Sequence, residues 1–205
     1  MCARPASKPW PMRWIVLTIL LAIVPYTWIS LHFRKKARPF EPYNDLRQRA
    51  NVHRLLAAGY HRIPLAAERP ADQVLSSPAA RAEITPAAGG IPAALKDTLV
   101  EIPNVPEAIR GVITSAASST LLPYTIDIDC TLSDLNLGLA SSYLYLKGDE
   151  LILLNGFEAV AGELRSRSRE MTLRLTAPAG TLPPGNYQVT AVGAHESRQW
   201  HLNVK

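Results

Sequence analysis

The stretch Tyr124-Thr125-Ile126-Asp127-Ile128-Asp129-Cys130 decides how the second half of this 205-residue chain folds. Every second side chain from Tyr124 to Cys130 is apolar, and the side chains between them are polar. Because successive side chains of a β-strand point to opposite faces, this period of two puts the apolar set on one face. The pattern predicts a strand of an antiparallel sheet, with one face in the core and the other toward solvent.

The same alternation recurs on both sides of this stretch. About seven short strands, separated by turns such as Lys147–Glu150, indicate an all-β C-terminal domain over residues 93–205. About 100 residues are enough to close one such core. The further predicted strands are Ile109–Ile113, Ser142–Leu146, Leu151–Leu154, Met171–Thr176, Tyr187–Val192 and Trp200–Val204.

The turn Leu182-Pro183-Pro184-Gly185-Asn186-Tyr187 leads into a strand whose first large residue is Tyr187. It resembles the tyrosine corner of immunoglobulin-like and fibronectin-type domains, in which the phenol bonds back to nearby backbone. The resemblance covers about residues 105–205 and implies an immunoglobulin-like antiparallel β-sandwich, with Tyr187 and Trp200 as structural residues. The Cys–Trp–Cys signature of antibody domains is absent, since Cys130 is the only cysteine in this region. The antibody type is therefore excluded.

The run Trp14–Phe33, WIVLTILLAIVPYTWISLHF, contains no Asp, Glu, Lys or Arg. A helix of this length spans roughly 30 Å, which is the thickness of a bilayer core. Aromatic residues near both ends suit the membrane interface, flanking cations resist burial, and the internal proline predicts a kink. The sequence predicts one transmembrane helix over 14–33. The residues expected to fix it in the membrane are Trp14, Pro25, Trp28, Arg34, Lys35 and Lys36.

Two alternatives to a retained span are a cleaved signal peptide and a buried core helix. The run is long for a signal peptide and Leu31–Lys35 offers no small-residue cleavage site, while a core helix would normally show a polar face. We therefore expect a signal-anchor and a single-pass protein of the cell (inner) membrane. More Lys and Arg follow the span than precede it, which favours a cytoplasmic C-terminal side. The layout of short tail, span, spacer and terminal domain favours an extracytoplasmic (periplasmic) one, which we expect.

Charge is distributed unevenly along the chain. Residues 1–62 hold 11 Lys/Arg and two acids, whereas residues 63–205 hold 11 Lys/Arg and 15 acids. The predicted β-domain is therefore mildly acidic, and the cations bracket the apolar run. This distribution suits a membrane surface and argues against nucleic acid as a partner.

Three segments connect the predicted parts. Residues 1–13 form a basic tail, and residues 34–62 form a basic juxtamembrane segment with a short helix over about 45–58. Residues 63–92 are rich in Ala and Pro and are predicted to be a semi-stiff spacer. Three roles remain open for the basic helix face, which are solvation, binding to anionic lipid headgroups and docking of a membrane partner. That face carries Arg47, Arg49 and Arg54.

Two patterns could carry chemistry. Asp127-Ile128-Asp129-Cys130-Thr131 resembles the nucleophile loop of haloacid-dehalogenase-like phosphatases, which implies an aspartate nucleophile and Mg²⁺. Such enzymes alternate strands with helices, and this region shows no helical crossover. A Ca²⁺ site built from Asp127, Asp129 and Asp134 is a second hypothesis, without the spacing of an EF-hand. We expect no catalytic residues and no cofactor.

The predicted function is that of a membrane-anchored, non-enzymatic interaction module or an accessory subunit of a larger membrane assembly. In layout the chain is similar to the small single-span accessory proteins found beside bacterial respiratory oxidases. The expected partners are the lipid bilayer and a membrane protein, with Tyr143 and Tyr145 as candidate contacts. The alternatives are a ligand- or Ca²⁺-binding sandwich domain and a phosphatase-like enzyme.

Overall fold

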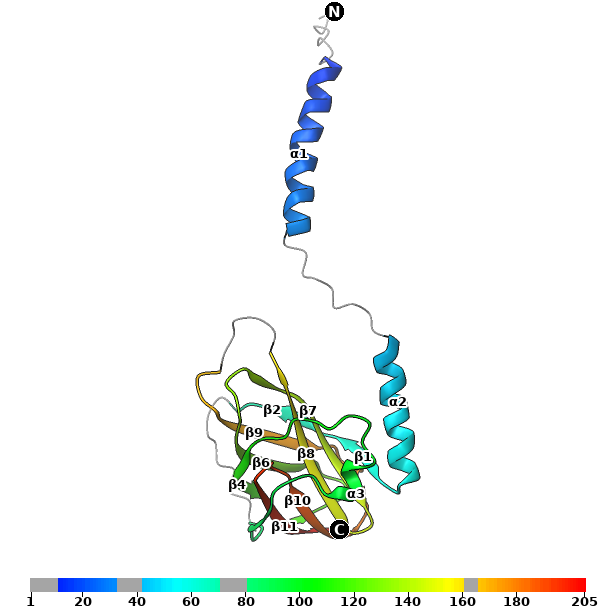
Figure 1. Ribbon diagram of the computed structural model, residues 1–205, viewed down its shortest axis with the longest axis vertical. Coiled ribbons are helices and arrows are strands. Elements are labelled where there is room, and N and C mark those ends of the chain that lie inside the picture. The colour runs from blue at the N-terminus through cyan, green and yellow to red at the C-terminus, as the bar shows by residue number, and fades with distance from the viewer. Residues whose placement is uncertain (1–10, 33–41, 71–80, 161–165) are drawn as a thin grey trace, which may run out of the picture. The chain divides into compact units, whose positions relative to one another are not determined.

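The computed structural model describes residues 11–32, 42–70, 81–160 and 166–205 (Figure 1). The chain divides into two compact units, residues 1–43 and residues 44–205. The helices are α1 (Met12–His32), α2 (Pro42–Ala57) and α3 (Ala93–Lys96). The strands are β1 (His61–Pro64), β2 (Ala66–Glu68), β3 (Thr85–Ala88), β4 (Ala108–Thr114), β5 (Ala117–Ser118), β6 (Tyr124–Thr131), β7 (Leu137–Lys147), β8 (Glu150–Ala159), β9 (Glu170–Ala177), β10 (Gly185–Ala191) and β11 (Glu196–Val204).

Helix α1 is the N-terminal apolar helix, and it has 21 residues where the sequence predicts a span over 14–33. Among the described residues it is the one helix long and apolar enough to cross a membrane, and none of its apolar window is buried within the protein. A membrane anchor and a signal sequence share these properties. Trp14, Pro25 and Trp28 lie in this helix, with the Trp28 ring stacked on His32. Arg34, Lys35 and Lys36 lie outside the described residues.

The strands form one barrel-like sheet, not two packed sheets. Among the described residues, eleven strands join one sheet, and nine follow the order β1-β7-β8-β10-β11-β4-β6-β9-β2. The sheet is mixed, because β10 runs parallel to β8 and β11 runs parallel to β4. The prediction of an immunoglobulin-like antiparallel β-sandwich is therefore wrong, as is the family resemblance on which it rested. Alternating strands are common to sandwiches and barrels, so the pattern alone does not distinguish them.

One short segment closes the barrel. Strand β1 pairs with β7, and two residues later β2 pairs with β9 at the opposite end of the strand order. Between them, Leu65 N donates to Ser142 O at 3.0 Å, so the segment stays bonded to β7 until it reaches β9. We call residues 61–68 the closing segment. Its pairing leaves neither β7 nor β9 with an open edge along this stretch, which removes a site for edge-to-edge association.

A second segment covers the weakest seam of the barrel, between β4 and β11. In the described part of the chain, these strands share a single aligned pair, Glu196 with Ala108. Residues 81–88 bridge the seam, since Ala82 N donates to Thr114 O at 3.0 Å and β3 pairs with β11. The stretch 63–92, which the sequence predicts to be a spacer, thus contributes most of the closing segment and all of β3 to the sheet.

The barrel interior is apolar around one hydrogen-bonded centre. Trp200 is 1% exposed, and its Nε1 donates to the Tyr124 hydroxyl at 3.1 Å. That hydroxyl also lies 2.7 Å from Thr114 Oγ1. The Tyr187 hydroxyl donates to Pro183 O at 2.9 Å, so the local contact of a tyrosine corner is present although the fold it suggested is not.

Helices α2 and α3 pack on the outer face of β7 and β8. Leu55 of α2 and Leu95 of α3 are fully buried there against Tyr145, Ile152 and Leu154. Strand β8 is consequently buried on both faces, which explains its apolar run Leu151–Leu154. Helix α2 occupies nearly the range predicted for the juxtamembrane helix. After it, Gly59 adopts a positive φ of 81° and turns the chain into β1.

The buried phenol of Tyr124 predicts a loss of stability at alkaline pH. Burial raises its pKa to about 12, against hydrogen bonds from Thr114 and Trp200 that lower it. In the unfolded chain the Tyr124 phenol loses its proton first, near its ordinary pKa of 10.0. The contribution of the neutral phenol to folding stability is therefore complete below that pH and is lost as the pH rises through about 12.

In urea titrations of the full chain in detergent, followed by β-sheet circular dichroism, the free energy of unfolding should fall by up to about 1.4 kcal/mol per pH unit for this group over that interval. Tyr124→Phe should make the free energy of unfolding depend less steeply on pH over this interval. It should also lower stability at neutral pH by about 1–3 kcal/mol, because Trp200 Nε1 loses its acceptor. The same slope in both proteins would contradict the assignment.

Candidate binding groove

A groove of about 330 Å³ lies between α2, the segment 99–104 and the outer face of β7 and β8. Tyr143 and Gly156 line the strand side, Gln48 and Asn51 line the helix side, and Arg62 of β1 also lines the groove. We call this the α2 groove. All its walls belong to the unit of residues 44–205, so its shape is set within one compact body.

The walls are tied to one another by hydrogen bonds. Arg54 Nη2 donates to Asp97 O at 2.8 Å, and Val100 N donates to Asn51 Oδ1 at 3.3 Å. On the far side, Phe157 N donates to Asn104 O at 2.8 Å, which fixes the 99–104 segment on β8. These bonds hold the groove open in a defined shape, as a pre-formed binding site requires.

Gly156 permits the close approach of two walls. A Cβ at this position would lie 2.7 Å from Ser141 Oγ and 3.2 Å from Pro103 Cβ. A larger residue would therefore force the Ser141 hydroxyl to move and would crowd Pro103 of the 99–104 segment. The glycine in this apolar strand is explained by the groove and not by a turn.

The lining combines aromatic, charged and apolar groups. The Arg62 guanidinium lies 4.6 Å from the centre of the Tyr143 ring, a cation–π contact that orients both side chains. Tyr143 in turn meets the ring of Tyr145 edge-on, with centroids 6.2 Å apart. Glu101 and Glu158 add negative charge, and Ile102 is 52% exposed at the rim.

The two predicted contact residues have different surroundings. Tyr143 is partly buried and lines the groove beneath Arg62. Tyr145 is 3% exposed and packs under α2, and burial raises its pKa to about 12, with Arg62 lowering it and Tyr143 raising it. No pattern in the sequence indicates the other lining residues, because α2 and the 99–104 segment meet only in the fold. The polar and charged residues among them are Gln48, Asn51, Arg62, Glu101, Asn104, Ser141 and Glu158.

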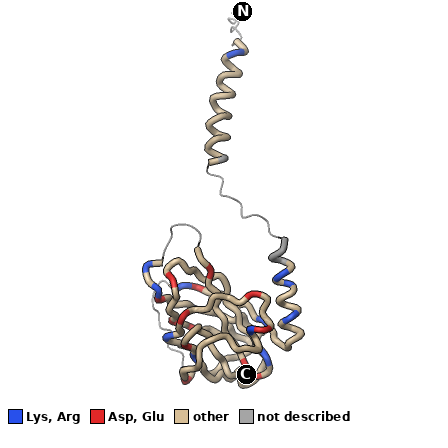
Figure 2. The backbone as a smooth tube through the Cα atoms, viewed as in Figure 1, with Lys and Arg blue, Asp and Glu red and all other residues tan. Residues whose placement is uncertain are grey.

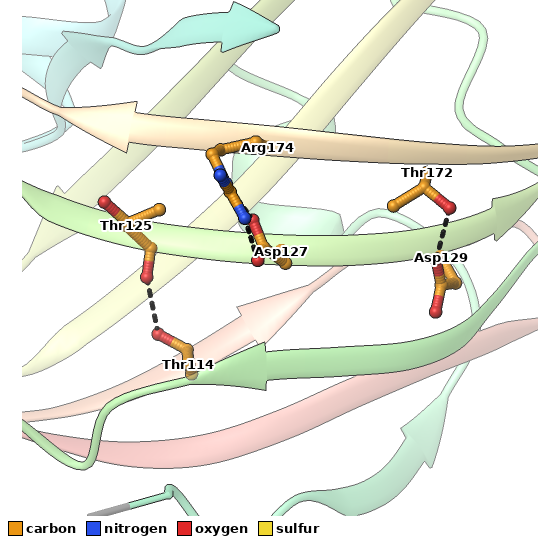
Figure 3. Close-up of polar contacts among 6 residues, drawn as sticks. All are labelled: Thr114, Thr125, Asp127, Asp129, Thr172 and Arg174. Carbon is orange, nitrogen blue, oxygen red and sulfur yellow. Dashed lines mark hydrogen bonds and ion pairs between the residues drawn. The ribbon is translucent and has the colours of Figure 1, made fainter. Parts of the chain in front are cut away.

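The three acidic residues proposed for Ca²⁺ are engaged in bonds within the protein, and Figure 3 shows two of them, Asp127 and Asp129. Asp127 and Asp129 point outward from β6 toward β9, where Arg174 Nε and Nη2 bind Asp127 at 2.8 and 2.9 Å and Thr172 Oγ1 donates to Asp129 at 2.7 Å. Asp134 accepts from its own loop, from Asn136 N at 3.3 Å. Among the residues described, no group of three or more His, Cys, Asp or Glu side chains is placed to hold a metal ion.

The phosphatase-like motif lies on an antiparallel strand, whereas its chemistry needs a strand of a parallel sheet. Strand β6 runs antiparallel to both neighbours, β4 and β9, and so lacks the parallel crossover arrangement. Cys130, beside it, is buried at 1% exposure with its Sγ 3.3 Å from Met171 O. Burial, with a smaller effect of Asp129, raises the pKa of this thiol to about 12, so it remains a neutral core residue.

The contact between Asp127 and Arg174 predicts a structural role for this acid. The two side chains are 14% and 26% exposed, and the hydrogen bond to Asp127 raises the pKa of Arg174. Asp127→Asn should lower the free energy of unfolding by about 1 kcal/mol, because the charge-assisted bidentate pair is lost. Asp134→Asn keeps its acceptor oxygen and should change nothing.

Thermal unfolding of the full chain in detergent gives the melting temperatures of the wild type and of both variants, each with and without CaCl₂. Calcium should leave all three melting temperatures unchanged. A calcium-dependent rise in the wild type that Asp127→Asn abolishes would contradict the structural assignment.

Comparison with known proteins gives no match, since no family model, no curated protein and no solved structure is detectably similar to the chain.

Proposed function

We propose that the protein is a single-pass membrane protein whose barrel domain binds an extramembrane segment of a membrane-embedded partner in the α2 groove. It works as an accessory subunit of a larger membrane assembly and catalyses no reaction. The single observation that carries this proposal is the α2 groove itself, a pre-formed hollow with hydrogen-bonded walls and a mixed lining.

The lining favours a polypeptide as the bound species. Arginine and tyrosine are enriched among the residues that dominate protein–protein binding energy, and here Arg62 and Tyr143 are already held against each other. The exposed Ile102 offers an apolar contact at the rim. Because Glu101 and Glu158 lie in the same groove, a phosphate backbone would be repelled, which disfavours nucleic acid.

The N-terminal helix supports the membrane location. Its apolar side chains find no burial within the protein, and a helix of 21 residues matches a bilayer core. A retained span would confine the groove near the membrane and raise its effective concentration toward a partner in the same bilayer. Modest affinity in the groove would then be sufficient for stable association.

Site-specific crosslinking tests the groove. A photo-crosslinking amino acid at Ser141, which lines the groove, should form an adduct with one membrane protein in intact cells. The same group at Gln188, an exposed site on β10, should not. Ile102→Asp, at an exposed position, should abolish the Ser141 adduct because it places a charge in the apolar part of the contact. Equal adducts at Ser141 and Gln188, or an adduct that survives Ile102→Asp, would overturn the groove assignment.

Membrane fractionation and intact-mass measurement test the anchor. The protein should remain in membranes after alkaline carbonate extraction and should keep the apolar helix at full mass, 22.5 kDa. A mature form that begins beyond His32 would identify the helix as a signal sequence. A reporter fused after Lys205 should be active outside the cytoplasm, as the layout of tail, span and terminal domain favours. Activity only inside would reverse the orientation.

A further inference from the structure

A second hollow, of about 350 Å³, lies on another part of α2 and has a different chemistry. It is lined by Gln48, Arg49, Val52, His53 and Arg62. We call it the cationic hollow. The side chains described there supply two guanidinium groups and an imidazole and no carboxylate, in contrast to the α2 groove with its two glutamates.

The three cationic or donor side chains converge because of how α2 meets β1. Arg49 and His53 are four residues apart and therefore project from the same face of the helix. Arg62 comes from β1, which antiparallel pairing with β7 fixes beside α2. In the described part of the chain, neither Arg49 nor Arg62 forms a salt bridge, and the cation–π contact of Arg62 with Tyr143 brings no carboxylate to either guanidinium.

We infer that the cationic hollow binds the phosphate of an anionic phospholipid headgroup. Guanidinium groups match phosphate oxygens with paired N–H donors, and an imidazole N–H adds a third direction. The inference rests on one part of the proposed function, the retained span. The hollow shares Gln48 and Arg62 with the α2 groove, whereas Arg49 and His53 line only the hollow.

Charge and chain length favour a lipid over a free phosphate. Helix α2 carries Arg47, Arg49 and Arg54, seen as blue segments of the tube in Figure 2. The sequence just before α2 carries four more cations, at Arg34, Lys35, Lys36 and Arg38. Ten residue steps separate His32 from Pro42, and a fully extended chain of that length reaches at most about 35 Å. If α1 spans the bilayer, α2 is therefore kept within reach of the headgroup layer, where cations are attracted to anionic lipid.

Native mass spectrometry of the full chain in neutral detergent tests this inference. The wild type should retain phosphatidylglycerol in preference to phosphatidylcholine. Arg49→Gln combined with His53→Gln should weaken phosphatidylglycerol binding about fivefold or more, since one cation and one further donor are lost. Both positions are exposed, so the fold should persist, which β-sheet circular dichroism checks. Arg49→Lys combined with His53→Lys should restore part of the preference.

Two controls distinguish lipid binding in the hollow from a general effect of charge and from binding of free phosphate. Arg167→Gln removes the same charge at an exposed position outside the hollow and should leave lipid binding unchanged. Inorganic phosphate and glycerol 3-phosphate, added alone, should compete only at far higher concentrations than the lipid. Equal loss in Arg167→Gln, no preference for phosphatidylglycerol, or competition by inorganic phosphate at the lipid's own concentration would overturn the inference. A chain that fails to associate with lipid bilayers at all would instead refute the anchor.

Discussion

The pairing of residues 61–68 with both β7 and β9 is the constraint on which the rest of the structure depends. The main strand order begins at β1 and ends at β2, and these two strands are separated by Leu65 alone. Without this segment, the backbone groups that β7 and β9 present to it would be unpaired, and the apolar interior would open along one side. Ile63, which belongs to the core cluster, shows that the segment contributes side chains as well as backbone bonds.

The same constraint positions the candidate sites. Helix α2 ends at Ala57, Gly59 turns the chain, and β1 begins at His61, so pairing of β1 with β7 brings α2 onto the outer face of the barrel. Leu55 then completes the second apolar cluster. The α2 groove and the cationic hollow lie on different parts of the α2 surface and share Arg62 and Gln48. The two differ in charge because Glu101 and Glu158 line only the first.

The sequence predicts individual strands better than their arrangement. Alternation located β4, β6, β9, β10 and β11, since each has one face in the core, although the ends of several are longer than predicted. It could not reveal that residues 61–68 and 81–88 join the sheet. These stretches are short and contain Pro and Ala, and their pairing depends on strands far away in sequence. The Tyr187 corner was a correct local signal from which the wrong fold was inferred, because a bond across four residues does not specify how distant strands pair. The sequence predicted Tyr143 and Tyr145 only as candidate contacts, and both line the groove. Arg62 and Asn51 come to the groove from β1 and α2 only once the chain is folded, so the sequence did not indicate them.

The most direct test of the closing segment is an engineered disulfide between Ala66 and Thr176, which are aligned partners on β2 and β9. In the full chain with Cys2→Ser, Ala66→Cys with Thr176→Cys should oxidise almost completely and raise the melting temperature. Ala66→Cys with Thr172→Cys, displaced by about 13 Å along β9, should not oxidise, because a disulfide needs Cα atoms within about 7 Å. Equal oxidation of the two pairs, or none in either, would show that residues 61–68 do not close the barrel.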